Sequence, residues 1–335
     1  MASIPKRMAI IVAGGLVNII FGVILYFALM TALGNNTSLV VDEVILDYAA
    51  AEAGIQSEDE IIEINNNKIN IKSDIDKILN KSNGEELKIT VKRNGNMQDI
   101  ILTPTKQEYK STGIYLKAMS NGNTTKVLAV EKNSIAEKQG IKANDEILEV
   151  NDINVNNQEE IVNLMSEEGI KDIKLKIKRS NEILNINLNP DINYKYYLGI
   201  KFKLAENNLQ TNMYYAIFKT RDFVFSIADN LKMLFTGNVG IDQMMGPVGI
   251  SEAVASTKGL EDFVYLIALI SLSLGVTNLL PFPALDGGKF MLLILEAIRK
   301  KKLNEKTEIN IQLIGFTILI IISLYVTYND ILRII

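Results

Sequence analysis

The feature that most constrains this chain is an uncharged run that ends in two prolines and an aspartate. Residues 263–285 carry no charged side chain, and about 20 apolar residues suffice for a helix to span a bilayer. Pro281 and Pro283 interrupt this run, and Asp286 follows it, directly before Gly287. Broken backbone and ionisable groups at membrane depth persist only where they face protein or a water-filled cavity. We therefore expect a functional site at Asp286 rather than an ordinary helix end.

Two further uncharged runs predict a multi-pass α-helical membrane protein. We expect transmembrane helices at residues 8–34 and 308–329, and a broken transmembrane helix at residues 262–298. Most of the charge lies between the first and second of these segments, which indicates one large soluble insert. The chain should therefore have three spans and a separately folded insert.

The first span carries small and polar residues on one face. Gly14, Asn18 and Gly22 are spaced by four residues, so they lie one above another on a helix. Such a face favours close packing against a neighbouring membrane helix.

Basic residues predict the orientation of these spans. Lys6 and Arg7 precede the first span, and residues 299–302 lie between the second and third. The positive-inside rule places both clusters in the cytoplasm, for a protein of the cell membrane. The insert is then extracytoplasmic, and Asp286 lies toward the cytoplasmic side.

Composition excludes several kinds of chemistry. The chain has no histidine and no cysteine, so it has no Ser-His-Asp or Cys-His catalysis, no disulfide and no imidazole or thiolate metal ligand of its own. The net charge of −4 gives no reason to expect nucleic acid as a partner.

The insert is an internal duplication with an offset of 86 residues. Gly54-Ile55 and the segment 59–65 match Gly140-Ile141 and the segment 145–151. Each copy alternates short strands and helices, with a helix around Ser73–Asn80 in the first copy and Ser73 as its expected N-cap. Because one constant offset holds over the whole unit, the matches indicate a duplication rather than coincidence.

Each copy resembles a bacterial, circularly permuted PDZ domain. We expect two in tandem, at residues 38–118 and 119–205, each an α+β fold built as a partly open β-barrel. The resemblance implies that extended peptides bind by adding a strand to a sheet edge. The loops expected to receive the peptide carboxylate contain Gly113-Ile114 and Gly199-Ile200.

After the insert, residues 211–237 have apolar side chains at helical spacing opposite charged ones. This pattern predicts an amphipathic helix in the membrane interface. The following segment Met245–Ile250 is expected to be a turn because it contains Gly246-Pro247 and Gly249.

Several motifs together resemble the site-2 family of intramembrane zinc metalloproteases, of the bacterial sigma-E-protease type. The first motif is Asn-x-x-Pro-x-Pro-x-Leu-Asp-Gly at residues 278–287. The second is Ala-Gly-Gly-x-x-Asn at residues 13–18, where the family usually has proline in place of Gly15. The insert, the Gly-Pro-Val-Gly-Ile segment and the closing Tyr328-Asn329-Asp330 also fit.

The resemblance implies roles for residues of the broken span. Asp286 corresponds to the third protein ligand of the catalytic zinc, and Asn278 to a residue that holds the extended substrate. Pro281, Pro283 and Gly287 belong to the same substrate-binding segment. The implied activity is regulated intramembrane proteolysis of single-span regulatory proteins, such as anti-sigma factors.

The chain departs from the family in one respect. The family's first span carries His-Glu-x-x-His, which supplies two zinc ligands and the general base, and this sequence has no counterpart. One hypothesis is an enzyme whose first span is encoded upstream or separately. The alternative is a proteolytically inactive membrane protein that binds extracytoplasmic peptides or substrates through its PDZ domains. An unrelated PDZ scaffold would leave Asp286 unexplained.

Overall fold

The computed structural model describes residues 3–116, 125–166, 172–236, 244–255, 257 and 259–334. The chain divides into two compact units. One contains residues 30–219, and the other combines residues 1–29 with residues 220–335. The expected boundary between the PDZ domains, at residues 118 and 119, lies outside the described residues, as does the expected helix end at residue 237.

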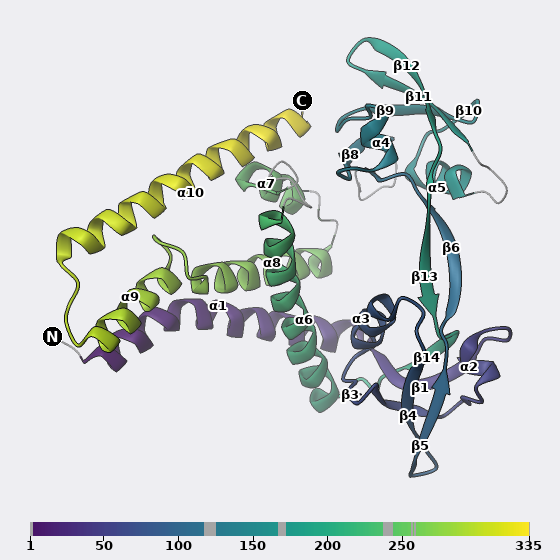
Figure 1. The fold of residues 1–335 in the computed structure, drawn as a ribbon, viewed down its shortest axis with the longest axis horizontal. Helices are drawn as coiled ribbons and strands as arrows, with labels where there is room; N and C mark the ends of the chain where they lie inside the picture. Colours follow the sequence, from purple (N-terminus) through teal and green to yellow (C-terminus); the bar gives the residue numbers. More distant parts are fainter. Residues whose placement is uncertain are drawn as a thin grey trace. The chain divides into compact units, whose positions relative to one another are not determined.

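The first repeat of the insert forms a sheet of antiparallel strands that pack against one longer helix, α3 (Figure 1). Its elements are β1 (Thr37–Val44), α2 (Ala49–Glu52), β2 (Glu60–Ile64), β3 (Asn67–Lys68), α3 (Lys72–Ser82), β4 (Leu87–Arg93) and β5 (Asn96–Leu102). Along β4, buried residues alternate with more exposed ones, and the buried ones, such as Ile89 and Val91, belong to one apolar core.

The second repeat has the same order of elements. They are β8 (Val127–Val130), α4 (Ile135–Lys138), β9 (Glu146–Val150), β10 (Ile153–Asn154), α5 (Gln158–Ser166), β11 (Ile173–Arg179) and β12 (Glu182–Leu188). Its core residues Val127, Ile147 and Ile177 lie 86 positions after Val41, Ile61 and Val91 of the first core. The predicted duplication is thereby confirmed.

The two repeats are nested rather than placed one after the other. The strand β14 (Ile200–Leu204) follows the second repeat but pairs with β1 of the first. The corresponding strand of the second repeat, β7 (Ile114–Leu116), pairs with β8. Two strands, β6 (Thr105–Ser111) and β13 (Asp191–Tyr197), pair along their whole length and connect the repeats (Figure 1).

This pairing differs from the tandem arrangement expected from the sequence. Gly199-Ile200 completes the first repeat and Gly113-Ile114 the second, each the reverse of the expected division. A strand can pair with any sheet edge that it can reach. The local sequence of residues 198–204 does not determine which of the two sheets this strand joins.

A buried ion pair fixes the same corner of each repeat. The guanidinium of Arg93 donates to both carboxylate oxygens of Asp59, at 2.7 and 2.6 Å, and Arg179 donates in the same way to Asp145. Burial by itself raises the pKa of Asp59, but hydrogen bonds from Arg93 and from the amide of Gln56 outweigh it and lower that pKa below its usual value.

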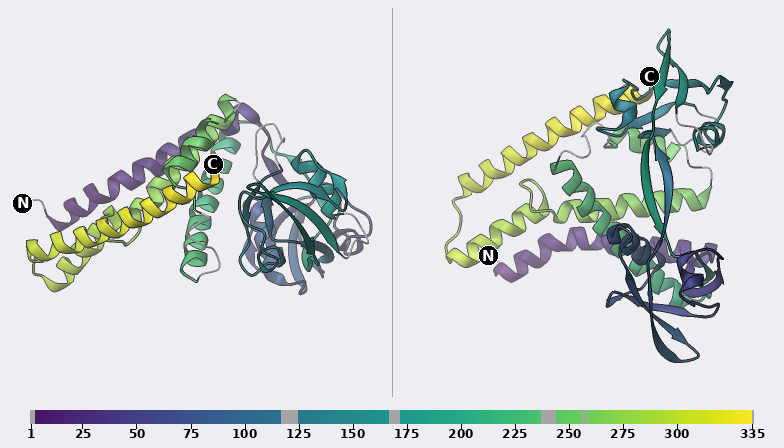
Figure 2. Two further views of the ribbon diagram at one scale, coloured as in Figure 1. Left: turned by 90° about the horizontal axis from the view of Figure 1, so that it is seen from above. Right: turned by 45° about the vertical axis from the view of Figure 1, so that its right-hand side comes forward.

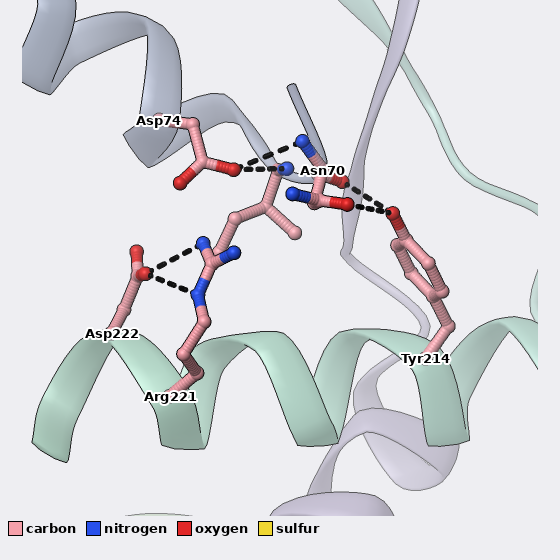
Figure 3. Close-up of polar contacts among 6 residues, drawn as sticks. Asn70, Asp74, Tyr214, Arg221 and Asp222 are labelled. Carbon is pink, nitrogen blue, oxygen red and sulfur yellow. Dashed lines mark hydrogen bonds and ion pairs between the residues drawn. The ribbon is translucent and has the colours of Figure 1, made fainter. Parts of the chain in front are cut away.

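The helix α3 begins one residue before the expected N-cap. Its N-cap is Ile71, not Ser73, so that prediction was wrong. Asp74 replaces the serine, because its carboxylate accepts hydrogen bonds from the amides of Asn70 and Ile71 at 2.9 and 3.2 Å. The hydroxyl of Tyr214 donates to the carbonyl oxygen of Asn70 at 3.1 Å (Figure 3).

Tyr214 belongs to α6 (Leu209–Phe235), which occupies most of the segment expected to be amphipathic. The division between the two compact units falls within this helix. Arg221 and Asp222, further along it, pair with each other at 2.9 Å (Figure 3).

The other unit is helical. It contains most of α1 (Ile4–Leu33) and all of α7 (Pro247–Ala255), α8 (Leu260–Leu279), α9 (Asp286–Arg299) and α10 (Glu305–Ile334). Among the described residues, α1, α8 and α10 are long and apolar enough to cross a membrane. In both views of Figure 2, α9 (yellow-green) runs beside the first part of α1 (purple).

Residues 247–250 of the Gly-Pro-Val-Gly-Ile segment are helical, so the expected turn at Met245–Ile250 was wrong for these four residues. Pro247 is the first residue of α7, where its missing N–H costs no hydrogen bond. The carboxylate of Asp330, near the end of α10, accepts a hydrogen bond from the amide of Gly249 at 2.8 Å. Two segments that carried the family resemblance therefore contact each other.

Candidate functional site

The proline pair separates α8 from α9. The first helix ends at Leu279, and Leu280 already has extended backbone. Pro281 and Pro283 cannot donate a main-chain hydrogen bond, so they cannot continue a helix. Six residues, 280–285, then connect the two helices before α9 starts at Asp286.

Asp286 occupies the first position of α9. A carboxylate is favourable there because the free N–H groups of a helix start carry partial positive charge. A Cβ atom built at Gly14 of α1 would lie 3.6 Å from Oδ2 of Asp286. The carboxylate therefore faces α1 at a residue without a side chain. It forms no hydrogen bond or ion pair with the residues that the structure describes.

The glycines after Asp286 are packed against the connecting segment. A Cβ at Gly287 would come within 2.3 Å of the carbonyl oxygens of Leu279 and Leu280, and one at Gly288 within 2.1 Å of that of Phe282. Only glycine allows the helix start to lie this close to the preceding main chain. Gly287, which the resemblance assigned to substrate binding, is thus buried by the chain itself.

The other residues expected to bind substrate are more accessible. Pro281 is exposed, while Asn278 and Pro283 are partly exposed. No hydrogen bond joins the Asn278 side chain to the described part of the chain. Asn278 lies in the last turn of α8 and Asp286 in the first turn of α9, so the two belong to the two sides of the helix break.

The predicted packing face of α1 contacts α8 and α9. Beyond Gly14 at Asp286, the carbonyl oxygen of Asn18 accepts a hydrogen bond from Ser271 at 2.8 Å. A Cβ atom at Gly22 would lie 2.4 Å from Leu272. Residues 14, 18 and 22 therefore meet the part of the chain that leads to Asp286.

Gly15 of the Ala-Gly-Gly-x-x-Asn motif and Gly275 of α8, which no sequence motif contained, make this contact closer. A Cβ at Gly275 would lie 2.8 Å from the carbonyl oxygen of Gly15, so the main chains of α1 and α8 approach each other directly here. Spaced small residues in both uncharged runs were the signal for this crossing.

An ion pair joins α1 to the far end of α9. Arg7 donates to both carboxylate oxygens of Glu296, at 3.2 and 3.3 Å, and Glu296 is buried. The helices therefore meet at two points, Arg7 with Glu296 and Gly14 with Asp286. In the sequence, Arg7 indicated only the orientation of the first span, and a lone Glu in the apolar face of α9 was the missed signal.

The helix α10 contacts the segment that connects α8 and α9. The side-chain oxygen of Gln312 accepts a hydrogen bond from the amide of Ala284 at 2.8 Å, and Gly315 touches Pro283. Gln312 lies within the candidate membrane span of α10, and a polar side chain inside such a span was the missed signal for this contact.

These residues alone do not fit a zinc ion. A catalytic zinc needs three protein ligands, usually nitrogen, sulfur or carboxylate groups, and the chain has no histidine or cysteine. Within the described residues, no three acidic side chains lie close enough together to hold a metal. Asp286 is therefore a candidate for one ligand of three.

The loop of Gly199-Ile200, which the sequence predicts to receive a peptide carboxylate, borders a cleft of about 600 Å³ in the first repeat. The helix α3 contributes Ile75 and Leu79 to one wall, and the segment Leu198-Gly199-Ile200 forms the other. Gly199 has a φ of +79°, and a Cβ there would overlap Tyr48. In the second repeat, Gly113 has a φ of +75° and is packed in the same way against Ser134, 86 residues after Tyr48.

Comparison with known proteins places these features in context. The family model for peptidase family M50 matches residues 1–322. The regulator of sigma-W protease RasP of Bacillus subtilis (strain 168) is 34% identical over 209 residues, which cover 60% of this chain and 49% of that protein. The putative zinc metalloprotease PM1991 of Pasteurella multocida is 28% identical over 355 residues, covering 99% and 79%.

The chain spans about half the length of the RasP proteins it matches. Among solved structures, a phage-ligand complex of the HtrA3 PDZ domain matches with a TM-score of 0.25 and 18% identity, over 27% of this chain and 93% of that domain.

Proposed function

The chain belongs to peptidase family M50, and we propose that it forms the part of a membrane-embedded zinc metalloprotease that contributes Asp286 as a metal ligand. The observation that carries this proposal is the placement of the Asp286 carboxylate. It stands at a helix start, opposite the bare main chain of Gly14, with no hydrogen bond or ion pair to the described residues. A carboxylate between membrane helices is costly unless it has a ligand to bind.

The other ligands must come from residues outside this sequence. The family resemblance points to a span with His-Glu-x-x-His, which would bring two imidazoles and a glutamate. Gly14 has no side chain and is exposed, so space remains beside Asp286 for a group from another helix.

The test measures bound zinc with and without such a span. The chain should be purified alone and with a co-expressed single-span polypeptide that carries His-Glu-x-x-His, and zinc counted by mass spectrometry. We expect about one zinc per complex, none on the chain alone, and loss of zinc from the Asp286→Ala complex. The Glu305→Ala variant, which removes an exposed carboxylate of α10, is the control. Equal zinc in wild-type and Asp286→Ala complexes would refute the proposal.

We propose that the substrate is the transmembrane segment of a single-span regulatory protein, held in extended form beside the break between α8 and α9. Support comes from Asn278, whose amide has no partner in the described chain, and from exposed Pro281. The name of the Bacillus subtilis relative, a regulator of sigma-W protease, favours an anti-sigma factor as the regulatory protein.

A variant at Asn278 tests substrate binding separately from metal binding. The Asn278→Ala complex should keep its zinc, because no metal ligand is removed. It should lose most photo-cross-linking to a substrate span, because the side chain that contacts the substrate main chain is removed. The Thr277→Ala variant, changed at the neighbouring exposed position, should behave like the wild type. Unchanged cross-linking in Asn278→Ala would exclude this role.

For the insert, we propose that the first repeat binds the carboxyl terminus of an extended peptide. The cleft is lined by apolar residues of α3 and β14, including Ile75, Leu79 and Ile200, and also by Gly199. Peptide addition at a sheet edge uses such a groove. A peptide with a free carboxyl terminus should bind more tightly than its amide. Ile200→Ala should weaken that binding, whereas Ile114→Ala should affect only peptides held by the second repeat. Equal binding of acid and amide would contradict the proposal.

A proteolytically inactive, peptide-binding membrane protein is the second candidate. The described residues contain no group of three acidic side chains that could hold a metal ion, which favours this candidate. In that case, the zinc experiment gives no metal in any combination while peptide binding remains.

We also propose that the insert is extracytoplasmic and that α9 ends in the cytoplasm of a bacterial cell. The basic residues 299–302 support this orientation. Because the chain has no cysteine, Lys301→Cys and Glu58→Cys can be labelled separately in intact cells with an impermeant maleimide. Only Glu58→Cys should react.

A further inference from the structure

The segment before Asp286 has the form of a type II β-turn with an unusual residue in it. The amide of Leu285 donates to the carbonyl oxygen of Phe282 at 3.1 Å, and Pro283 and Ala284 are the two central residues. Ala284 has a φ of +77°. Type II turns take proline at the second position but need a positive φ at the third, where glycine is normal. Alanine there is strained, so the local sequence favours a different turn.

The alternative is a type I turn, which differs by rotation of one peptide group. In a type I turn, the residue after proline has a negative φ, which suits alanine. The conversion rotates the peptide between Pro283 and Ala284 by about half a turn, so the amide of Ala284 reverses direction. Whatever binds that amide therefore selects between the two turns.

In this structure, α10 binds it. The Gln312 side-chain oxygen accepts a hydrogen bond from the Ala284 amide at 2.8 Å. The orientation of the Gln312 side chain is fixed by this contact, because the opposite orientation would bring two N–H donors together. The side-chain nitrogen of Gln312 is buried without a hydrogen-bond partner among the described residues. The side-chain oxygen is therefore the atom of Gln312 that makes a specific contact here.

Gly315 holds the other side of the same peptide. It lies three residues after Gln312, on the same face of α10. A Cβ atom at Gly315 would come within 2.4 Å of both the Cβ and the carbonyl oxygen of Pro283. The Pro283–Ala284 peptide therefore rests directly on the backbone of α10, between Gln312 and Gly315.

We propose that Gln312 and Gly315 are positioning residues for Asp286, because they hold the Phe282–Leu285 turn in its type II form. Ala284 lies two residues before Asp286, so rotation of the peptide changes the direction in which the chain enters α9. The carboxylate then no longer faces Gly14. The role of α10 in positioning a metal ligand rests on the proposed function of Asp286. The geometry of the turn does not depend on that function.

The absence of cysteine from the chain allows a direct measurement that needs no zinc. The double variant Gly14→Cys/Asp286→Cys reports the contact of α1 with the start of α9 through its rate of thiol cross-linking in membranes. A second double variant, Gly22→Cys/Leu272→Cys, reports the contact of α1 with α8 and serves as the control.

Gln312→Leu should slow cross-linking of the 14–286 pair by about tenfold and leave the 22–272 pair unchanged. Gln312→Glu keeps an acceptor at the same reach and should retain the wild-type rate within about threefold. Gly315→Ala should slow the 14–286 pair as Gln312→Leu does, since its added Cβ displaces Pro283.

Ala284→Gly is the decisive addition. Glycine accepts a positive φ without strain, so Ala284→Gly should restore cross-linking to the Gln312→Leu variant. A merely structural role for Gln312 predicts no such rescue. The proposal is overturned if Gln312→Leu leaves the 14–286 rate unchanged, slows both pairs equally, or is not rescued by Ala284→Gly. Failure of Asp286 to bind zinc would leave these rates as predicted, so the two proposals fail separately.

Discussion

Replacement of Asp59 by asparagine should unfold the first repeat of the insert selectively. Asp59 is fully buried and accepts two hydrogen bonds from Arg93 and one from the amide of Gln56. Asparagine keeps an acceptor for Gln56 but loses the charge that Arg93 pairs with. Removing one partner of a buried pair costs about 3–5 kcal/mol. Because the Arg93 side chain is 20% exposed, water recovers part of its charge, so we expect about 3 kcal/mol.

Hydrogen exchange measured by mass spectrometry on the full chain can localise this loss. A loss of about 3 kcal/mol corresponds to about a 100-fold increase in the equilibrium for opening. Amides of β4 should therefore exchange about 100-fold faster in Asp59→Asn wherever exchange requires opening of that repeat. Amides of β11 should be unaffected, since the second repeat is one continuous segment that includes its own edge strand β7.

Asp145→Asn is the matched control because Asp145 makes the same contacts with Arg179. It should accelerate β11 and spare β4. If Asp59→Asn accelerated β4 and β11 equally, the repeats would unfold as one unit, and their two cores would not be independent. If neither variant changed exchange by more than about threefold, the buried pairs would contribute little to stability.

Three further predictions concern pH and the helical unit. Because the pKa of Asp59 is lowered in the folded state, its stabilising contribution is fully present above the unfolded pKa of about 3.9 and is lost as pH falls through the folded pKa. Exchange of β4 amides should therefore accelerate at acid pH in the wild type, but not in Asp59→Asn. Gly275→Ala places a methyl group 2.8 Å from a main-chain oxygen, so it should lower the free energy of unfolding in detergent by about 1–3 kcal/mol. The control Gly259→Ala, whose Cβ would have no atom within 4 Å, should lower it by less than about 1 kcal/mol. Arg7→Glu or Glu296→Arg alone should lower the melting temperature, and the double variant should recover most of the loss; additive losses would show that the Arg7–Glu296 pair contributes nothing.

Much of the fold followed from the sequence because the responsible forces are local. Hydropathy over 20 residues identifies a candidate span, and prolines end α8 wherever that helix packs. The duplication followed from a constant offset of 86 residues, and the buried positions of both cores repeat with it. Errors occurred where short polar side chains compete for the same role, as with Ser73 and Asp74 at the start of α3.

The sequence by itself therefore determined three apolar helices, a break before Asp286 and two copies of one α+β unit. The tertiary structure decided which copy receives β14, since either sheet edge accepts a strand of that pattern. It also decided that Asp286 faces Gly14, that Arg7 pairs with Glu296, and that Gln312 binds Ala284. These contacts join residues that are 28 to 289 positions apart. No local propensity encodes them, because they depend on how whole helices pack.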